Sequence, residues 1–132
     1  MNSLEAVADA IMHYEGWYAA SRSNRNRNPG NLRDSHFKTG EDPQGYAIFP
    51  NLPIGYNALL ADLEAKFMGR TVSGLTPDST LFDLFKVYAP ASDDNVPEAY
   101  ADFVAGWVSK ALNRTITPQT KLRDIWQPAE EG

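Results

Sequence analysis

With 132 residues, of which 42% are hydrophobic and 11% aromatic, the chain is long enough for a modest core and too apolar to be disordered. It has no cysteine, which excludes disulfide bonds and thiol catalysis, and no apolar run long enough to cross a membrane. The net charge of −5 argues against a general nucleic-acid binder. We expect one domain over residues 1–132, with a frayed tail over residues 128–132.

The first predicted element is a helix over residues 3–14, where apolar residues recur at helical spacing on one face. Asn2 followed by Glu5 resembles a capping box at its start. Gly16 favours a left-handed termination, which puts Glu15 in the last turn.

The next segment, residues 19–31, is rich in Ser, Asn, Arg, Pro and Gly and is predicted to be a loop. Two short extended pieces, residues 32–33 and 46–49, are predicted to form a small hairpin. The residues between them, 39–43, have the composition of a turn.

Four further helices are predicted from apolar periodicity and from capping or helix-breaking residues. They begin at Pro53, Thr80, Pro97 and Thr120, and the first two end at Gly69 or Gly74 and at Pro90. The side of the helix from Pro97 that is expected to face the core carries Tyr100, Phe103, Val104, Trp107 and Val108. Trp126 is also expected in the core. The whole pattern predicts an α+β fold, mostly helical, with a small β-hairpin beside a substrate cleft.

Glu15 is the leading candidate for chemistry, because it follows an amphipathic helix and precedes an amide-rich loop. The negative end of the helix dipole disfavours a carboxylate there, and Tyr14, Trp17 and Tyr18 are expected to exclude water. Both effects favour the protonated carboxyl group that a general acid needs to cleave a glycosidic bond. The alternative interpretation is a surface glutamate before a helix-ending glycine.

Basic residues gather in one stretch that also holds the asparagines: Arg22, Arg25, Arg27, Arg33 and Lys38. They form either a solvated loop or a rim that faces an anion, and a small binder of nucleic acid or another anionic polymer is one hypothesis. Only His13 and His36 supply imidazole, so no metal site is expected.

Three stretches carry a family resemblance: residues 10–17 (AIMHYEGW), 25–33 (RNRNPGNLR) and 45–50 (GYAIFP). Together they resemble lysozyme-like peptidoglycan hydrolases of phages and bacteria, including endolysins. The nearest group is the single-domain lytic transglycosylase-like proteins of phages. Residues 87–90, with Asn95 and Tyr100 downstream, resemble the second cleft wall of that group. Asn-Pro-Gly-Asn-Leu-Arg is the most specific motif.

The resemblance implies a lysozyme-like fold that cleaves the MurNAc–GlcNAc β-1,4 bond of peptidoglycan, with Glu15 as the general acid. The substrate-binding residues that it implies are Asn28, Asn31, Tyr46, Tyr88 and Asn95. Two motifs depart from lytic transglycosylases: Glu15-Gly16 replaces their Glu-Ser pair, and the Asn-Pro-Gly-Asn-Leu-Arg motif replaces a Gly-Leu-Met-Gln type sequence. The glycosidase family and the product therefore stay open.

Two mechanisms fit. A hydrolase needs a second carboxylate, for which Asp34, Glu41 and Asp42 are the candidates. A lytic transglycosylase needs one acid, which then acts as a base while the muramyl 6-hydroxyl closes an anhydro ring. We interpret the three acids as turn residues and favour the transglycosylase. A non-catalytic glycan-binding or virion structural module is the alternative from another class.

The N-terminus has no basic region followed by a hydrophobic stretch, so no signal peptide is visible. We expect action on the cell wall, in the periplasm, reached by a phage, secretion-system or other route that the chain does not encode. The expected partner is the glycan strand of peptidoglycan. We expect a monomer that needs no cofactor, binds no nucleic acid and does not insert into a membrane.

Overall fold

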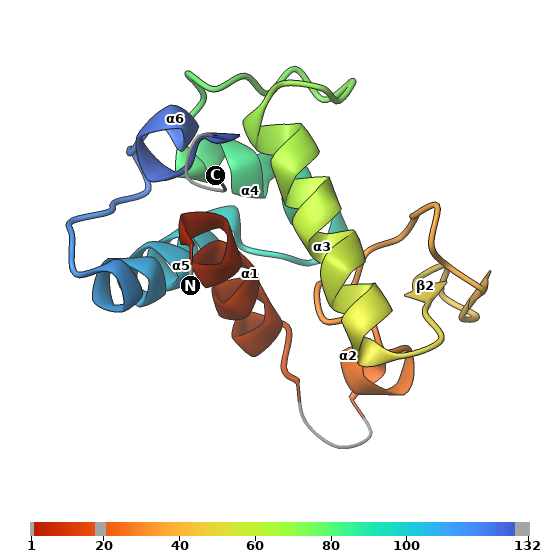
Figure 1. Ribbon diagram of the computed structural model, residues 1–132. Helices are drawn as coiled ribbons and strands as arrows, with labels where there is room; N and C mark the ends of the chain where they lie inside the picture. The colour runs from red at the N-terminus through yellow and green to blue at the C-terminus, as the bar shows by residue number, and fades with distance from the viewer. Residues whose placement is uncertain (1, 18–20, 129–132) are drawn as a thin grey trace.

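Helices make up most of the computed structural model, which describes residues 2–17 and 21–128 (Figure 1). The longer helices are α1 (Ser3–Tyr14), α3 (Leu52–Phe67), α4 (Leu81–Tyr88) and α5 (Pro97–Leu112). The short ones are α2 (Arg22–Arg25), the 3-10 helix η1 (Ala91–Asp93) and α6 (Leu122–Ile125). Strands β1 (Gly40–Glu41) and β2 (Ala47–Ile48) form an antiparallel pair in which Gly40 is opposite Ile48. The predicted α+β class with a small hairpin is confirmed.

The start of α1 follows from its capping residues. The Asn2 side chain accepts a hydrogen bond from the Glu5 amide at 2.8 Å, and the Glu5 carboxylate accepts one from the Asn2 amide at 2.9 Å. The helix ends at Glu15, its C-cap residue, and Gly16 follows with φ of 78°. The predicted helix and the place of Glu15 at its end are therefore confirmed.

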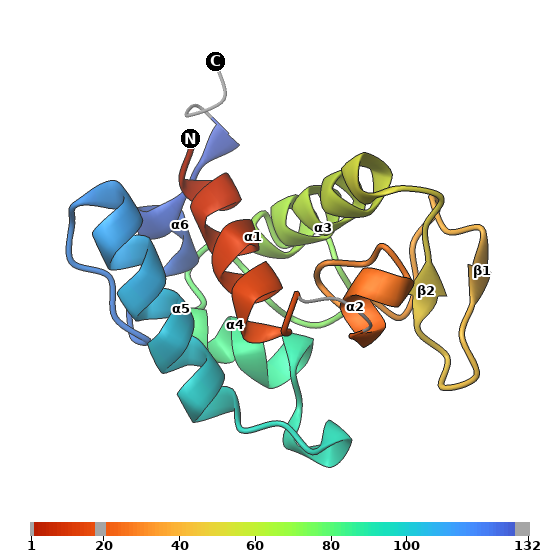
Figure 2. The same ribbon diagram turned by 90° about the horizontal axis from the view of Figure 1, so that it is seen from below.

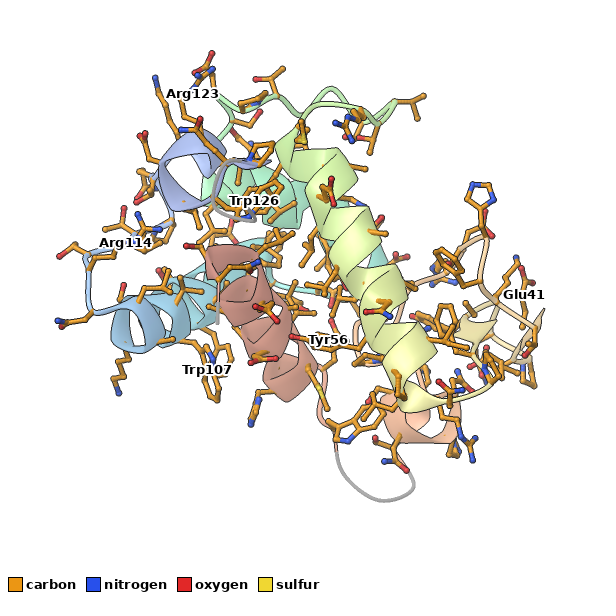
Figure 3. All side chains as sticks on the ribbon, in the orientation of Figure 1. Glu41, Tyr56, Trp107, Arg114, Arg123 and Trp126 are labelled. Carbon is orange, nitrogen blue, oxygen red and sulfur yellow. The ribbon has the colours of Figure 1, made fainter. Side chains whose placement is uncertain are left out.

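Helix α1 lies between α5 and α3 and packs against both, while α4 packs against α5 (Figure 2). The buried side chains form one hydrophobic cluster in which Tyr100 is fully buried and Trp126 is 2% exposed. Two members of the expected core face of α5 are not fully buried, although Trp107 still packs against the buried cluster. Phe103 is 38% exposed, and Trp107 is half-buried at the outer edge of the helices (Figure 3). Their rings contact residues at the end of α1, Trp107 on His13 and Phe103 on Tyr14.

The first strand differs from the prediction. It is Gly40–Glu41, within the segment expected to be a turn, and residues 32–33 form no strand. Leu32 still reaches the hairpin, because its carbonyl accepts a hydrogen bond from the Ala47 amide at 2.9 Å. Leu32 forms no further strand hydrogen bond, because its amide donates to the side-chain oxygen of Asn28 instead of to a strand partner.

Helix α2 lies inside the predicted loop. It is a single turn, which Ser21 caps by accepting a hydrogen bond from the Asn24 amide at 3.3 Å. Because its four residues are all polar, the sequence contains no hydrophobic period that would predict it. Helix α6 begins at Leu122 rather than at Thr120, whose hydroxyl closes a turn by accepting from the Thr117 amide. Tyr18 and all of the expected tail except Pro128 lie outside the described residues.

Candidate active site

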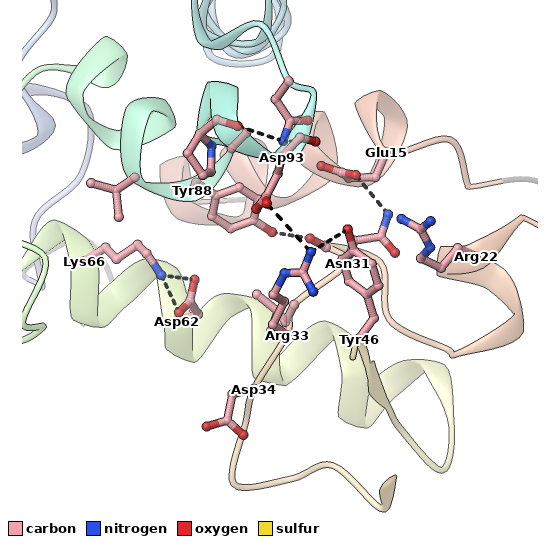
Figure 4. A pocket seen from close by; sticks show the side chains of 16 residues that line it. Glu15, Arg22, Asn31, Arg33, Asp34, Tyr46, Asp62, Lys66, Tyr88 and Asp93 are labelled. Atoms are coloured by element: carbon pink, nitrogen blue, oxygen red, sulfur yellow. Dashed lines mark hydrogen bonds and ion pairs between the residues drawn. The ribbon is translucent and has the colours of Figure 1, made fainter. Parts of the chain in front are cut away.

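A polar cavity of about 430 Å³ opens where the end of α1, the loop before the hairpin, α3, α4 and η1 meet (Figure 4). It brings together residues from distant parts of the chain. The residues named from the resemblance that line it are Glu15, Asn31, Tyr46, Tyr88 and Asn95. Asn28 does not line it, and neither does the half-buried Trp17.

Glu15 is held at both carboxyl oxygens. The side-chain amide of Asn31 donates to Oε1 at 2.9 Å, and the hydroxyl of Tyr100 donates to Oε2 at 2.6 Å. Asn31 approaches from the cavity lining, whereas Tyr100 approaches from the core. Two donors from opposite sides leave the carboxyl group little freedom to rotate, which is the positioning that proton transfer requires.

The sequence reasoning placed Tyr100 on the core side of its helix and, by resemblance, near the second cleft wall, but it did not foresee the hydrogen bond of Tyr100 to Glu15. Its ring is a core ring, stacked 4.4 Å from Phe85 and 3.9 Å from Tyr14 between ring centroids. Burial, the charges of Tyr88 and Glu15, and the hydrogen bond to Glu15 raise the pKa of Tyr100 well above its usual value, so the hydroxyl remains a donor at neutral pH. The available signal was general: a buried tyrosine needs a hydrogen-bond partner for its hydroxyl.

The expectation that Asn28 binds substrate is corrected by its surroundings. Its side chain is fully buried and pairs with backbone groups only. The amide nitrogen donates to the carbonyls of Leu32 at 2.8 Å and Ala47 at 2.9 Å, and the oxygen accepts from the Leu32 amide at 2.9 Å. Asn28 therefore ties the loop to strand β2 and leaves nothing free for a ligand.

The glycine and the second asparagine of the Asn-Pro-Gly-Asn-Leu-Arg motif, Gly30 and Asn31, also have structural reasons. A Cβ atom at Gly30 would collide with the hydroxyl of Tyr88 and the side chain of Leu59, and the Tyr88 hydroxyl donates to the Gly30 carbonyl at 2.6 Å. Asn31 then takes φ of 48°, in the left-handed region that asparagine tolerates better than most residues. This backbone turn aims the Asn31 amide at Glu15.

Tyr46 lies between two arginines on the cavity wall (Figure 4). The guanidinium carbons of Arg22 and Arg33 lie 4.2 Å and 4.3 Å from its ring centroid, within cation–π range. Arg33 also donates to the Tyr46 hydroxyl at 3.2 Å and to the Gln44 carbonyl at 3.0 Å. Of the basic stretch noted in the sequence, only Arg22 and Arg33 line the cavity.

The hairpin acids behave largely as turn residues. Lys38 pairs with Asp34 at 2.8 Å and with Glu41 at 2.7 Å, and Glu41 lies at the outer edge of the hairpin (Figure 3). The hydrogen bond from Lys38 lowers the pKa of Asp34, which is the one hairpin acid on the cavity wall.

Asp42 closes the hairpin turn. Its carboxylate accepts from the Asn26 side chain and from the amides of Gln44 and Tyr46, each at 2.9 Å. Partial burial raises the pKa of Asp42, but these hydrogen bonds and the charge of Arg22 lower it by more, so the net shift is downward. The carboxylate of Asp42 therefore has a structural role in the hairpin turn.

Two further acids line the cavity wall, Asp62 and Asp93, and neither was among the sequence candidates for a second carboxylate. Both oxygens of Asp62 accept from Lys66 at 2.6 Å, and Asp93 lies 4.0 Å from Arg33. Each lining aspartate is therefore within 4.0 Å of a cation. Glu15 forms no ion pair with any residue in the described ranges 2–17 and 21–128.

Asn95 also lines the cavity, where its amide makes long hydrogen bonds of 3.4 Å to the carbonyls of Pro90 and Asp93. Within the described part of the chain, no three acidic or imidazole side chains gather into a group able to hold a metal ion. Likewise, every described helix falls short of the length and apolar character of a membrane span.

Comparison of the chain with models of protein families, with curated proteins and with solved structures finds no match. The chemistry of the cavity must therefore be judged from its own residues.

Proposed function

We propose that this protein cleaves the glycan strands of peptidoglycan at the MurNAc–GlcNAc β-1,4 bond, as a lytic transglycosylase with a lysozyme-like fold. One observation carries the proposal: Glu15 is oriented by two hydrogen bonds at the wall of an open polar cavity and has no cationic partner among the described residues. The resemblance of the motifs around Glu15 and Asn31 to lysozyme-like proteins supports the choice of substrate. Its place of action is then the cell wall.

In the proposed reaction, Glu15 first donates its proton to the oxygen of the glycosidic bond as that bond breaks. Oε1 is the oxygen that we assign to this step, since its partner Asn31 lines the cavity while the partner of Oε2 is in the core. The carboxylate then takes the proton of the muramyl 6-hydroxyl, whose oxygen bonds to the anomeric carbon and closes the anhydro ring. Tyr100 keeps the carboxyl group in place in both steps.

The single-acid mechanism is favoured over hydrolysis by the pairing of the other carboxylates. A hydrolase needs a second carboxylate that activates water or attacks the sugar. Asp34, Asp62 and Asp93 line the cavity, but each is next to a cation, and Lys66 contacts both oxygens of Asp62. By contrast, the carboxyl group of Glu15 accepts hydrogen bonds from neutral donors, the Asn31 amide and the Tyr100 hydroxyl.

The test is mass spectrometry of the products that the purified protein releases from purified peptidoglycan. Anhydro-muropeptides would support the transglycosylase, whereas reducing ends would replace it by a hydrolase. No release by a folded protein that still binds glycan would make it a non-catalytic binding module. The Glu15→Gln variant serves as the control for contaminating activity, since its amide cannot donate the required proton.

A further inference from the structure

Arg22 is unusual among the cations of the cavity. Its side chain is half-buried on the wall, and its Nε atom is buried without a hydrogen-bond partner among the described residues. It also forms no ion pair with any residue that the structure describes. A buried N–H donor without a partner is rare in folded proteins, and at a cavity wall it points to a missing acceptor.

Arg33 shares the ring of Tyr46 with Arg22, since the two guanidinium carbons lie 4.3 Å and 4.2 Å from the centroid of that ring. Its contact with Asp93 is loose, at 4.0 Å, and half of its side chain is exposed. The hydrogen bonds to Gln44 and to the Tyr46 hydroxyl fix the orientation of its planar fork. The ring therefore holds two guanidinium groups in place, and both keep donors for an acceptor from outside.

We propose that Arg22 and Arg33, held on Tyr46, form a subsite that binds a carboxylate of the substrate. This inference rests on the proposed function, because it names which glycans the same cavity accepts. Guanidinium groups match the planar geometry of carboxylates, and such charge-assisted hydrogen bonds are stronger than neutral ones. Neutral glycans made only of N-acetylglucosamine lack the group that this subsite binds.

The charge of the cavity limits the ligand to a small anion. Arg22, Arg33 and Lys66 are the basic side chains on its wall, against the acids Glu15, Asp34, Asp62 and Asp93. Lys66 is paired with Asp62 at 2.6 Å, whereas Arg33 has only the 4.0 Å contact with Asp93 and Arg22 has no ion pair among the described residues, so the two arginines carry the positive charge that is open to a ligand. A polyphosphate or nucleic acid carries more negative charge than two arginines on a wall with four acids can match, whereas a single carboxylate is matched by the arginine pair.

Two parts of peptidoglycan carry such a carboxylate. Where the peptide has been removed, the lactyl group of muramic acid ends in a free carboxylate. Where the peptide is present, the lactyl carboxyl is in an amide bond and the carboxylates belong to the peptide stem. Soluble fragments of each kind, with and without amidation of their carboxyl groups, separate these sources.

The experiment measures binding by calorimetry with the Glu15→Gln variant, so that no ligand is consumed. The ligands are a peptide-free glycan fragment, a muropeptide, the amidated form of each, and a chito-oligosaccharide of equal length. We expect at least one carboxylate ligand to bind about tenfold more tightly than its amidated form, and this preference to weaken as salt increases. Whichever ligand shows the preference identifies the source of the carboxylate.

The variants Arg22→Gln and Arg33→Gln, each in the Glu15→Gln background, should lose the preference while keeping the weaker binding of neutral ligands. Arg25→Gln is the matched control, because Arg25 belongs to the same basic stretch but is exposed and does not line the cavity. Arg22→Lys, which keeps the charge and loses the planar fork, replaces Arg22→Gln if that variant does not fold, and it should lose most of the preference.

Equal affinity for carboxylate and amidated ligands, or no binding of either, would overturn the subsite, and so would a preference that survives both arginine substitutions. The product analysis of the wild-type protein gives an independent result. Binding with carboxylate preference but without cleavage would leave the subsite standing and remove the proposed function. Cleavage without the carboxylate preference would support the proposed function and overturn the subsite.

Discussion

The side-chain amide of Asn31 donates a hydrogen bond to Oε1 of Glu15 over 2.9 Å. It links the loop after α2 to the end of α1. The contact depends on backbone geometry, because Asn31 has φ of 48° and the preceding Gly30 has no room for a Cβ atom beneath Tyr88. The loop motif thus presents a donor to the carboxyl group at which we propose proton transfer.

Replacing Glu15 with glutamine should remove nearly all glycan cleavage and leave the fold intact. Glutamine keeps the size of the side chain but cannot donate the proton, and general acid catalysis contributes about 100-fold to 10,000-fold. Release of soluble muropeptides from purified peptidoglycan measures the loss, and circular dichroism confirms the fold. A folded variant with most of its activity would show that Glu15 is not the acid.

Replacing Asn31 with glycine should lower turnover about tenfold or more while changing the melting temperature little. Glycine accepts the positive φ without strain and removes only the amide that orients Glu15. Alanine at the same position should also reduce stability, by roughly 1–2 kcal/mol, because its Cβ disfavours the left-handed conformation. Unchanged turnover in the glycine variant would make Asn31 a structural residue.

Replacing Asn28 with alanine should have the opposite pattern. The buried amide of Leu32 and the carbonyls of Leu32 and Ala47 lose their side-chain partner, and an unsatisfied buried group costs about 1–3 kcal/mol. Chemical denaturation should record this loss, while the activity per folded molecule at low temperature stays within a few-fold of wild type. Stability equal to wild type would contradict the bracing role.

Replacing Tyr100 with phenylalanine should reduce turnover about 10-fold to 100-fold, because the ring stacking remains and only the donor to Oε2 of Glu15 is lost. Tyr56→Phe is the matched control. It removes a hydroxyl that donates to Asp9 at 2.9 Å, away from the cavity. Both variants should lose comparable stability, but only Tyr100→Phe should lose activity. Equal activity in the two would leave Tyr100 with a packing role alone.

The elements with strong local signals were predictable from the sequence. The capping boxes of Asn2 with Glu5 and of Thr80 with Asp83 set the starts of α1 and α4 through residues three apart. Strand β1 was not predictable in this way, since its two residues have no alternation and pair with β2 only through the folded hairpin. Helix α2 is likewise one polar turn.

The residues of the site likewise divide into those placed by local signals and those placed by the packing of distant elements. Glu15 was placed at the end of α1 by the glycine that follows it, which is a local signal. Arg22, Asp62 and Tyr100 reach the cavity or its acid only because three different elements pack together. Asn28 was assigned to the ligand by the family resemblance, and an asparagine in a polar loop gives no local sign of being buried that could have corrected it. Its role depends on the contact with Ala47 in β2.

The remaining prediction separates the two mechanisms through the aspartates of the cavity wall. If Glu15 acts alone, Asp34→Asn, Asp62→Asn and Asp93→Asn should each keep most of the activity. Asp42→Asn should keep it too, with a loss of stability instead, because Asp42 closes the turn that carries Tyr46. In a hydrolase, one of these carboxylates would have to activate water or bond to the sugar, and its loss would be nearly as severe as that of Glu15.

Asp62→Asn is the most informative of these variants, because Asp62 lines the cavity on α3 beside Lys66 and its charge also acts on Tyr88 across the cavity lining. A folded Asp62→Asn protein without activity would exclude the single-acid mechanism, and reducing-end products from the wild type would then identify Asp62 as the second carboxylate.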